Sequence, residues 1–193
     1  MAVTKFSNLT VTSGRTYNTF LAGNPAYVAS SYESIATATG TGSSNTITFS
    51  SIPSTFKHLQ IRINMREGAT GAPVNLRFNG DTGSNYSLHY LSGDGTSATA
   101  NGSASQTFTR IANYAGYAAN QHAGAIVDIL DYTSTSKYKT QRTSSGLDEN
   151  GTGYIWVASG LWMSTSAISS LTIYTTGNFN NTSTFALYGI KEA

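Results

Sequence analysis

The chain has 193 residues, no cysteine, 10% charged residues and a formal net charge of +2. Charged residues usually make up about 25% of a soluble domain, so this chain has less than half the usual supply. The charges are scattered, which excludes the basic stripe of a nucleic-acid-binding surface, and the lack of cysteine excludes disulfides and thiolate metal sites. No apolar run approaches the roughly 18 residues of a membrane span, so we expect neither a nucleic-acid nor a membrane partner.

Four small polar residue types dominate the composition, with 28 Thr, 26 Ser, 19 Gly and 15 Asn. Thr is β-branched and favours strands, whereas Gly, Asn and Ser supply turns and compete with helical hydrogen bonds. The length suits one sandwich or barrel, since such domains commonly reach about 200–250 residues. We therefore expect an all-β chain with one main domain.

Residues 1–31 differ from the rest of the chain because their apolar residues follow neither a strand period nor a helix period. These residues are Phe6, Leu9, Val11, Tyr17, Phe20, Leu21 and Tyr27. A segment of this kind has no partner set with which to form its own core, so it gains order by binding another surface. We predict an extended N-terminal arm over 1–31.

Residues 32–193 consist of short runs separated by turn-forming residues. The expected strands are Tyr32–Ala38, Asn45–Ser50, Phe56–Arg66, Val74–Asn79, Tyr86–Leu91, Gln106–Ala112, Ala125–Tyr132, Lys137–Ser144, Tyr154–Met163, Ile168–Thr175 and Thr184–Ile190. Segments rich in Gly, Asn, Asp and Ser lie between them, and none has a helical period. Many short strands at this spacing predict an antiparallel β-sandwich, of the jelly-roll type.

Two of these strands differ in how their apolar residues are distributed between the two faces. In 57–66 the apolar residues Leu59, Ile61, Ile63 and Met65 alternate with polar ones, which predicts one buried and one wet face. In 125–132 both faces carry apolar residues, so we expect this strand to be covered on both sides. If 133–136 closes a four-residue hairpin, Asp128 lies opposite Gln141 and diagonal to Lys139. This register predicts a buried structural ion pair of Asp128 with Lys139.

The strand over 154–163 is rich in aromatic residues. If its aliphatic residues face the core, Tyr154, Trp156 and Trp162 stand on the outer face. An exposed aromatic face of this kind serves either as a subunit interface or as a platform for sugar rings. We favour the interface, because a sugar site also needs polar groups that converge in a concavity. A bulge at Ser159–Gly160 would instead return Trp162 to the core.

The residues with catalytic or metal-binding chemistry do not converge. His58, His89 and His122 lie on different predicted segments, without the spacing of metal ligands. Asp128 and Asp131 are three apart on a strand and point to opposite faces, so they do not form an acid–base pair. The acidic turns at 79–83 and 148–151 lack the ligand pattern of a calcium loop. We predict no catalytic residue, no metal and no cofactor.

Several segments together resemble a known family. They are Tyr32–Ile35, Ile47–Phe49, Ser51–Pro53, Phe56–Arg62, Arg77–Tyr86, Asp128–Tyr132 and Phe185–Ile190. As a set they are similar to small β-rich structural proteins of tailed-bacteriophage virions, common among phages of cyanobacteria and other aquatic bacteria. The resemblance covers about residue 16 to the C-terminus. It leaves head decoration, head fibre and tail fibre all open.

The resemblance implies a virion protein that is not an enzyme. The expected partners are further copies of the chain, as a homotrimer by analogy alone, and the major capsid protein or other virion proteins. The apolar residues of the arm named above would then dock the chain on the particle. The alternative is a tail-fibre or receptor-binding module, in which loops such as 92–105 hold a host surface glycan.

Overall fold

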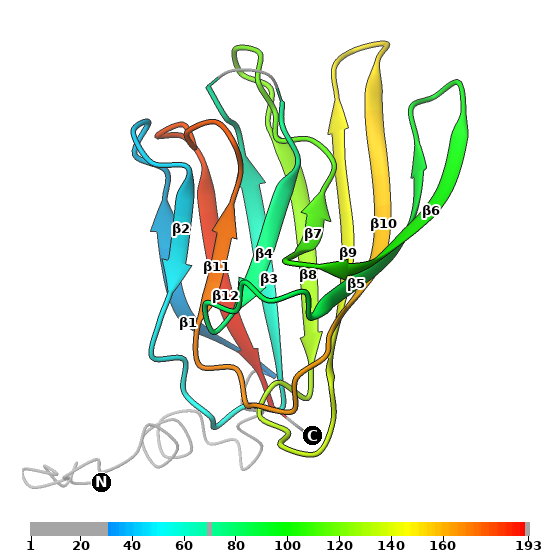
Figure 1. The fold of residues 1–193 in the computed structure, drawn as a ribbon. Coiled ribbons are helices and arrows are strands. Elements are labelled where there is room, and N and C mark those ends of the chain that lie inside the picture. Colours follow the sequence, from blue (N-terminus) through cyan, green and yellow to red (C-terminus); the bar gives the residue numbers. More distant parts are fainter. Residues whose placement is uncertain (1–30, 69–70, 192–193) are drawn as a thin grey trace, which may run out of the picture. The chain divides into compact units, whose positions relative to one another are not determined.

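The computed structural model describes residues 31–68 and 71–191, which form two antiparallel sheets packed as a sandwich (Figure 1). The chain divides into two units, Met1–Ser30 and Ser31–Ala193, and all that follows concerns the second. No helix occurs among the described residues. The predicted all-β class and antiparallel β-sandwich are confirmed.

The larger sheet has eight strands and the smaller sheet has four. In spatial order the large sheet contains β1 (Tyr32–Thr39), β12 (Thr184–Ile190), β3 (His58–Met65), β8 (Ala123–Leu130), β9 (Lys139–Asp148), β10 (Gly153–Trp162), β5 (Tyr86–Gly93) and β6 (Ala98–Gln106). The small sheet contains β2 (Thr46–Phe49), β11 (Leu171–Tyr174), β4 (Val74–Phe78) and β7 (Thr109–Ala112).

The path of the chain is that of a jelly roll, in which a long hairpin winds between two sheets. The strand pairs of that hairpin are β2 with β11, β4 with β7 and β5 with β6, and each pair lies side by side. The remaining pair, β3 and β10, is separated by the hairpin of β8 and β9. This hairpin, together with β1 and β12, gives the large sheet twice as many strands as the small sheet.

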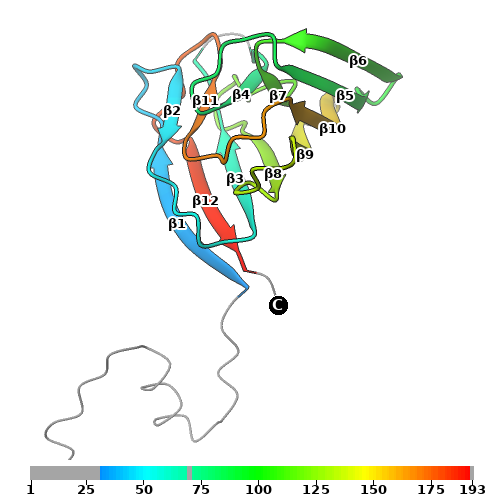
Figure 2. The same cartoon turned by 60° about the horizontal axis from the view of Figure 1, so that its bottom comes forward.

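The core lies between the sheets and follows the alternation of the strands. Leu59, Ile61, Ile63 and Met65 of β3 all face inward, as predicted, and are at most 5% exposed. Strand β7 packs across the inner side of β5, β8, β9 and β10. One sheet face is therefore buried, while the opposite face of the large sheet has no layer over it within the described residues (Figure 2).

The register of β8 with β9 differs from the prediction by one residue. Asp128 pairs with Arg142, and the connection runs from Asp131 to Tyr138 instead of over 133–136 alone. The reason is that Tyr132 leaves the strand and is buried, with its hydroxyl donating to the carbonyl of Pro53. A one-residue shift turns each side chain of a strand to the other face.

The predicted ion pair of Asp128 with Lys139 is wrong for this reason. Lys139 points inward and is fully buried, and its Nζ donates to the carbonyls of Lys137 and Thr165 at 2.9 and 3.2 Å. Asp128 is half-buried on the outer face, where its Oδ1 accepts a hydrogen bond from Gln60 Nε2 at 2.8 Å. The expectation that β8 is covered on both sides is also wrong, since its outward Ile126 is 47% exposed.

Candidate functional site

The outer face of the large sheet carries exposed apolar side chains from β5, β10 and β8. Leu91 of β5 is 64% exposed, Val157 of β10 is 50% exposed and Ile155 of β10 is 60% exposed. The register places Leu91 opposite Val157, Val157 opposite Ser144, and Ser144 opposite Ile126, so one row crosses β5, β10, β9 and β8. We call Leu91, Ile126, Ile155 and Val157 the apolar face.

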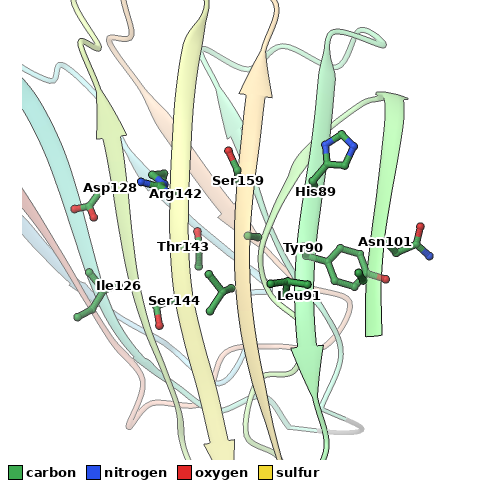
Figure 3. Close-up of a pocket in the computed structure, with 13 residues that line it drawn as sticks. His89, Tyr90, Leu91, Asn101, Ile126, Asp128, Arg142, Thr143, Ser144 and Ser159 are labelled. Carbon is green, nitrogen blue, oxygen red and sulfur yellow. The ribbon is translucent and has the colours of Figure 1, made fainter. Parts of the chain in front are cut away.

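A hollow of about 850 Å³ opens over this row and is shown in Figure 3. Its apolar lining includes Leu91, Ile126 and Val157. Its polar lining comes from the neighbouring row, in which His89, Ser159, Arg142 and Asp128 follow one another across β5, β10, β9 and β8. Asn101 of β6 closes the hollow on one side. Polar groups thus line one border of an apolar floor.

A second hollow of about 590 Å³ shares Ile126 and Ser144 with the first. Two glycines, Gly124 and Gly146, lie in its lining, and the register pairs them with each other. A Cβ added to Gly124 would meet no atom within 4 Å, so the space above it is open. The two hollows form one shallow trough along the outer face.

Charged groups near the trough differ in how well they are paired. Arg62 Nε donates to Gln60 Oε1 at 2.9 Å, and its guanidinium lies over the rings of Tyr188 and Tyr32 at 5.2 and 5.4 Å. Gln60 in turn donates to Asp128. Arg142 makes no hydrogen bond or ion pair within residues 31–68 and 71–191. Its guanidinium is therefore available to an anionic group.

The imidazole of His89 is held against the backbone of β6. A Cβ added to Gly102, the residue opposite His89, would lie 2.5 Å from His89 Cδ2, so only glycine leaves room for the ring. The other two histidines lie elsewhere: His58 Nδ1 accepts from the amide of Asp131 at 2.9 Å, and His122 Nε2 lies 2.8 Å from Thr182 Oγ1. In the described part of the chain no three His, Asp or Glu side chains gather closely enough to hold a metal ion.

The predicted aromatic outer face is wrong, because β10 is turned the other way. Trp156 and Trp162 are 1% and 3% exposed and face the core, whereas the aliphatic Ile155 and Val157 on either side of Trp156 face solvent. Trp156 stacks on Tyr90 with ring centroids 3.9 Å apart, and Arg110 lies over its ring at 5.8 Å. Tyr154 is half-buried and meets Tyr114 edge to face at 5.1 Å.

Trp162 is buried without the bulge considered at Ser159–Gly160, since β10 pairs continuously with both neighbours. Its Nε1 donates to Asp81 Oδ2 at 2.7 Å. This hydrogen bond is the main cause that lowers the pKa of the Asp81 carboxyl, with further donors from Asn85 and Gly83. The carboxylate of the turn at 79–83 thus anchors a tryptophan.

Two features were missed by the sequence interpretation. One is the trough itself, whose floor is formed by the residues assigned to the core. The other is Glu67, a fully buried carboxylate whose oxygens accept from the amides of Ala72 at 2.8 Å and Gly177 at 3.0 Å. Its position directly after the strictly alternating strand at 57–66 was the only feature of the sequence that could have indicated its burial. The residues predicted to dock on a particle, Phe6 to Tyr27, lie outside the described residues.

Comparison with known proteins gives no relative: no family model, no curated protein and no solved structure matches the chain. Among the described residues, no helix has the length and apolar character required to cross a membrane.

Proposed function

We propose that this chain is a structural protein of a bacteriophage virion, a homo-oligomeric capsid decoration or head-fibre subunit. The observation that carries the proposal is the apolar face, which exposes Leu91, Ile155 and Val157 side by side on a sheet with few charges. Contiguous exposed apolar surface marks an interaction site, and burial of each such side chain contributes about 1.5–3 kcal/mol. This surface supports a role in association with other protein surfaces.

Two further points support the virion setting. The jelly roll is an architecture that viral capsid proteins use, which is an argument by analogy. The segments from Tyr32 to Ile190 that resemble phage structural proteins supply the second point. In this proposal the partners are other copies of the chain, as a homotrimer, and the major capsid or another virion protein bound through residues 1–31.

The apolar face is tested by placing a charge at its centre. We expect the full-length chain to sediment as an oligomer at micromolar concentration and Val157→Lys to sediment as a smaller species with an unchanged circular dichroism spectrum. Thr48→Lys is the matched control, because Thr48 is an exposed strand residue on the small sheet. A wild-type monomer, or a Val157→Lys protein that sediments like the wild type, contradicts association through this face.

The virion setting is tested separately by quantitative mass spectrometry of purified particles. Many copies per particle indicate shell decoration, and a few copies indicate a fibre or tail component. Absence of the chain from purified particles contradicts the proposal.

A second candidate function is recognition of a host surface glycan by a tail-fibre or receptor-binding module. The observation that favours it is the unpaired Arg142 beside an apolar floor with His89, Ser159 and Asn101 nearby. Sites for small ligands commonly combine an apolar lining with a few polar groups, and a guanidinium binds carboxylates through two parallel hydrogen bonds. A glycan array should then show binding to acidic sugars that Arg142→Ala abolishes, and no binding to any sugar contradicts this candidate.

A further inference from the structure

Strand β6 is one edge of the large sheet and is exposed on both of its faces. It pairs with β5 alone, from Gly93 opposite Ala98 to Tyr86 opposite Gln106. All residues from 98 to 105 are exposed, so no layer packs on either side of the strand. Figure 2 shows β6 at the end of the sheet, away from the small sheet. An edge strand presents unpaired amide and carbonyl groups along its free side.

The edge at β6 lacks the devices that normally keep sheet edges apart. Such devices are charged residues, proline and bulges, and residues 98–106 contain neither a charge nor a proline. The irregularity in the pairing with β5 is confined to the end of the strand, near Ser105 with its φ of 53°. The stretch from Ala98 to Ser103 is therefore a regular and undefended ladder.

The opposite edge of the same sheet is defended. Strand β1 has a register shift between Ser34 and Ala36, where its ladder is interrupted. Glu33 on this strand forms an ion pair with Lys191 at 2.6 Å, so this edge strand carries a charged residue, unlike β6. The edge at β1 thus has features that oppose pairing with another strand, and the edge at β6 lacks them.

The hairpin that presents β6 is fixed before any partner binds. At its turn, Asp94 Oδ1 accepts hydrogen bonds from the amides of Thr96 at 2.8 Å and Ser97 at 2.6 Å. Gly95 supplies the positive φ of 88° that the turn needs. Along the strand, the ring of His89 lies against Gly102. A preformed edge loses little conformational entropy when a partner pairs with it.

The amide of Gly102 on β6 has a side-chain acceptor instead of a carbonyl from another strand. The amide of Gly102 donates to Oδ1 of the adjacent Asn101 at 2.7 Å. A side chain that bonds its neighbouring amide occupies the place of a carbonyl from another strand. If this hydrogen bond breaks, the Gly102 amide can donate to a carbonyl of a neighbouring strand instead.

We propose that β6 pairs antiparallel with β6 of a second copy of the chain, so that two eight-stranded sheets join into one across a two-fold axis. Small neutral side chains meet each other in this arrangement, so no like charges are brought together. A two-fold contact closes on itself, whereas pairing of β6 with β1 would meet Glu33 and the bulge and would continue head to tail. The edge and the apolar face are different surfaces, so the inference does not rest on association through the face.

The absence of cysteine from the chain allows a direct test by single substitutions. Thr99→Cys, Ala100→Cys and Asn101→Cys are made in the full-length protein, oxidised at micromolar concentration and run on a non-reducing gel. A disulfide requires Cβ atoms about 3.5–4.5 Å apart, and each step along a strand moves a residue by about 3.3 Å. The position nearest the two-fold axis should therefore give a several-fold higher yield of covalent dimer than its neighbours. The matched control is Thr37→Cys, an exposed residue on β1.

The possible outcomes separate the proposal from its alternatives. A peak of cross-linking within β6, with little for Thr37→Cys, supports the two-fold pairing. Equal yields at all four positions indicate random collision, and no dimer at any β6 position shows that the edge is free; either result overturns the proposal. Cross-linking only in mixtures of Ala100→Cys and Thr37→Cys proteins indicates head-to-tail pairing and also overturns it. The proposed function would remain supported if no β6 position cross-links but the protein is still an oligomer that Val157→Lys dissociates.

Discussion

At the residue scale, the charged side chains with the greatest structural effect are buried ones that bond to the backbone. Glu67 accepts from the amide of the nearby Ala72 and from that of the distant Gly177, and Lys139 donates to two carbonyls. Asp128, which the sequence marked as the buried carboxylate, lies on the half-exposed outer face. Burial, and not the apolar character of the neighbours in sequence, decides which charge is costly to remove.

Replacement of Glu67 should therefore destabilise the fold more than replacement of Asp128. We expect Glu67→Ala to lower the free energy of unfolding by about 2–4 kcal/mol, because the amides of Ala72 and Gly177 lose a charged acceptor. Asp128→Ala should lower it by less than about 1 kcal/mol, since Asp128 loses one bond to Gln60 at a partly solvated site. Urea denaturation measures both values. Equal effects would contradict the assignment of Glu67 as the structural carboxylate.

Lys139 gives a prediction about pH. Burial lowers the pKa of its ammonium group from the usual 10.5, so the folded state holds this proton less tightly than the unfolded state does. The charged form is thus a penalty on folding that is fully present below the lowered pKa and is relieved as pH rises toward 10.5. The melting temperature of the wild type should therefore rise relative to that of Lys139→Met as the pH increases from 7 toward 10.5. Lys139→Met also loses the hydrogen bonds to the carbonyls of Lys137 and Thr165, so the test is how the difference between the two proteins changes with pH and not its sign. A difference that does not change with pH would contradict this account, because both proteins share all other titrating groups.

At the element scale, β10 shows how two apolar faces are told apart. Its inward residues are Trp156, Ala158, Gly160 and Trp162. A Cβ added to Gly160 would lie 2.1 Å from Thr109 Oγ1 and 2.4 Å from Gln141 Oε1, so the inner face is narrow at this point. Small residues occupy the place where β7 approaches, and tryptophans fill the wider space on either side. Since both faces of the strand are apolar, only the neighbouring strand decides which one is buried.

Adjacent substitutions in β10 should separate these two faces. We expect Trp156→Ala to lower the free energy of unfolding by about 3–5 kcal/mol, the usual cost of removing a buried tryptophan. Val157→Ala, on the exposed face, should change it by less than about 0.5 kcal/mol in the monomer. Chemical denaturation in dilute solution measures both. A small loss for Trp156→Ala would show that its ring is not part of the core.

Other elements differ in how far their sequence predicts them. The strand at 57–66 alternates strictly, so its inner face was predicted correctly. Strand β9 has the inward residues Lys139, Gln141 and Thr143, and no hydrophobic pattern marks its direction. Gln141 bonds to Thr143 and Thr109, whereas Lys139 bonds to two backbone carbonyls. Strand β6 was assigned to a loop because Gly, Ser, Asn and Ala predominate and no face is apolar. The prediction failed for strands in which the hydrophobic pattern of the side chains does not indicate which residues are buried.

At the scale of the whole molecule, the insertion of the β8–β9 hairpin between β3 and β10 determines the candidate site. It widens the large sheet beyond the small one, brings Ile126 and Ser144 into the row of Leu91 and Val157, and places Arg142 in the adjacent polar row. The trough therefore combines residues that are far apart in the chain, such as Leu91 and Val157, which are separated by 66 positions.

The sandwich should fold without the N-terminal segment. We expect a protein that begins at Ser31 to keep the melting temperature of the full chain, because the carbonyl of Ser31 still accepts from the amide of Lys191 at 3.0 Å. If residues 1–30 dock the chain on a particle, the truncated protein should no longer bind to particles that lack the chain. Thermal unfolding and co-sedimentation with such particles measure the two effects. A truncated protein that melts normally and still coats particles would contradict the docking role.

The all-β class, the positions of most strands and the inner face of β3 could be predicted from the amino-acid sequence. These features follow from local rules: residue propensity, turn chemistry and an alternation that marks one face. The face of β10, the register of Asp128 with Arg142 and the presence of β6 at the edge became known from the folded structure alone. The physical reason is that each of these depends on what lies opposite in space. Close packing by β7 on β10 and burial of Tyr132 beside Pro53 are contacts between segments far apart in the chain, which a local pattern does not contain. Strand β6 is held by its backbone ladder with the preceding strand β5, which leaves no pattern in its side chains.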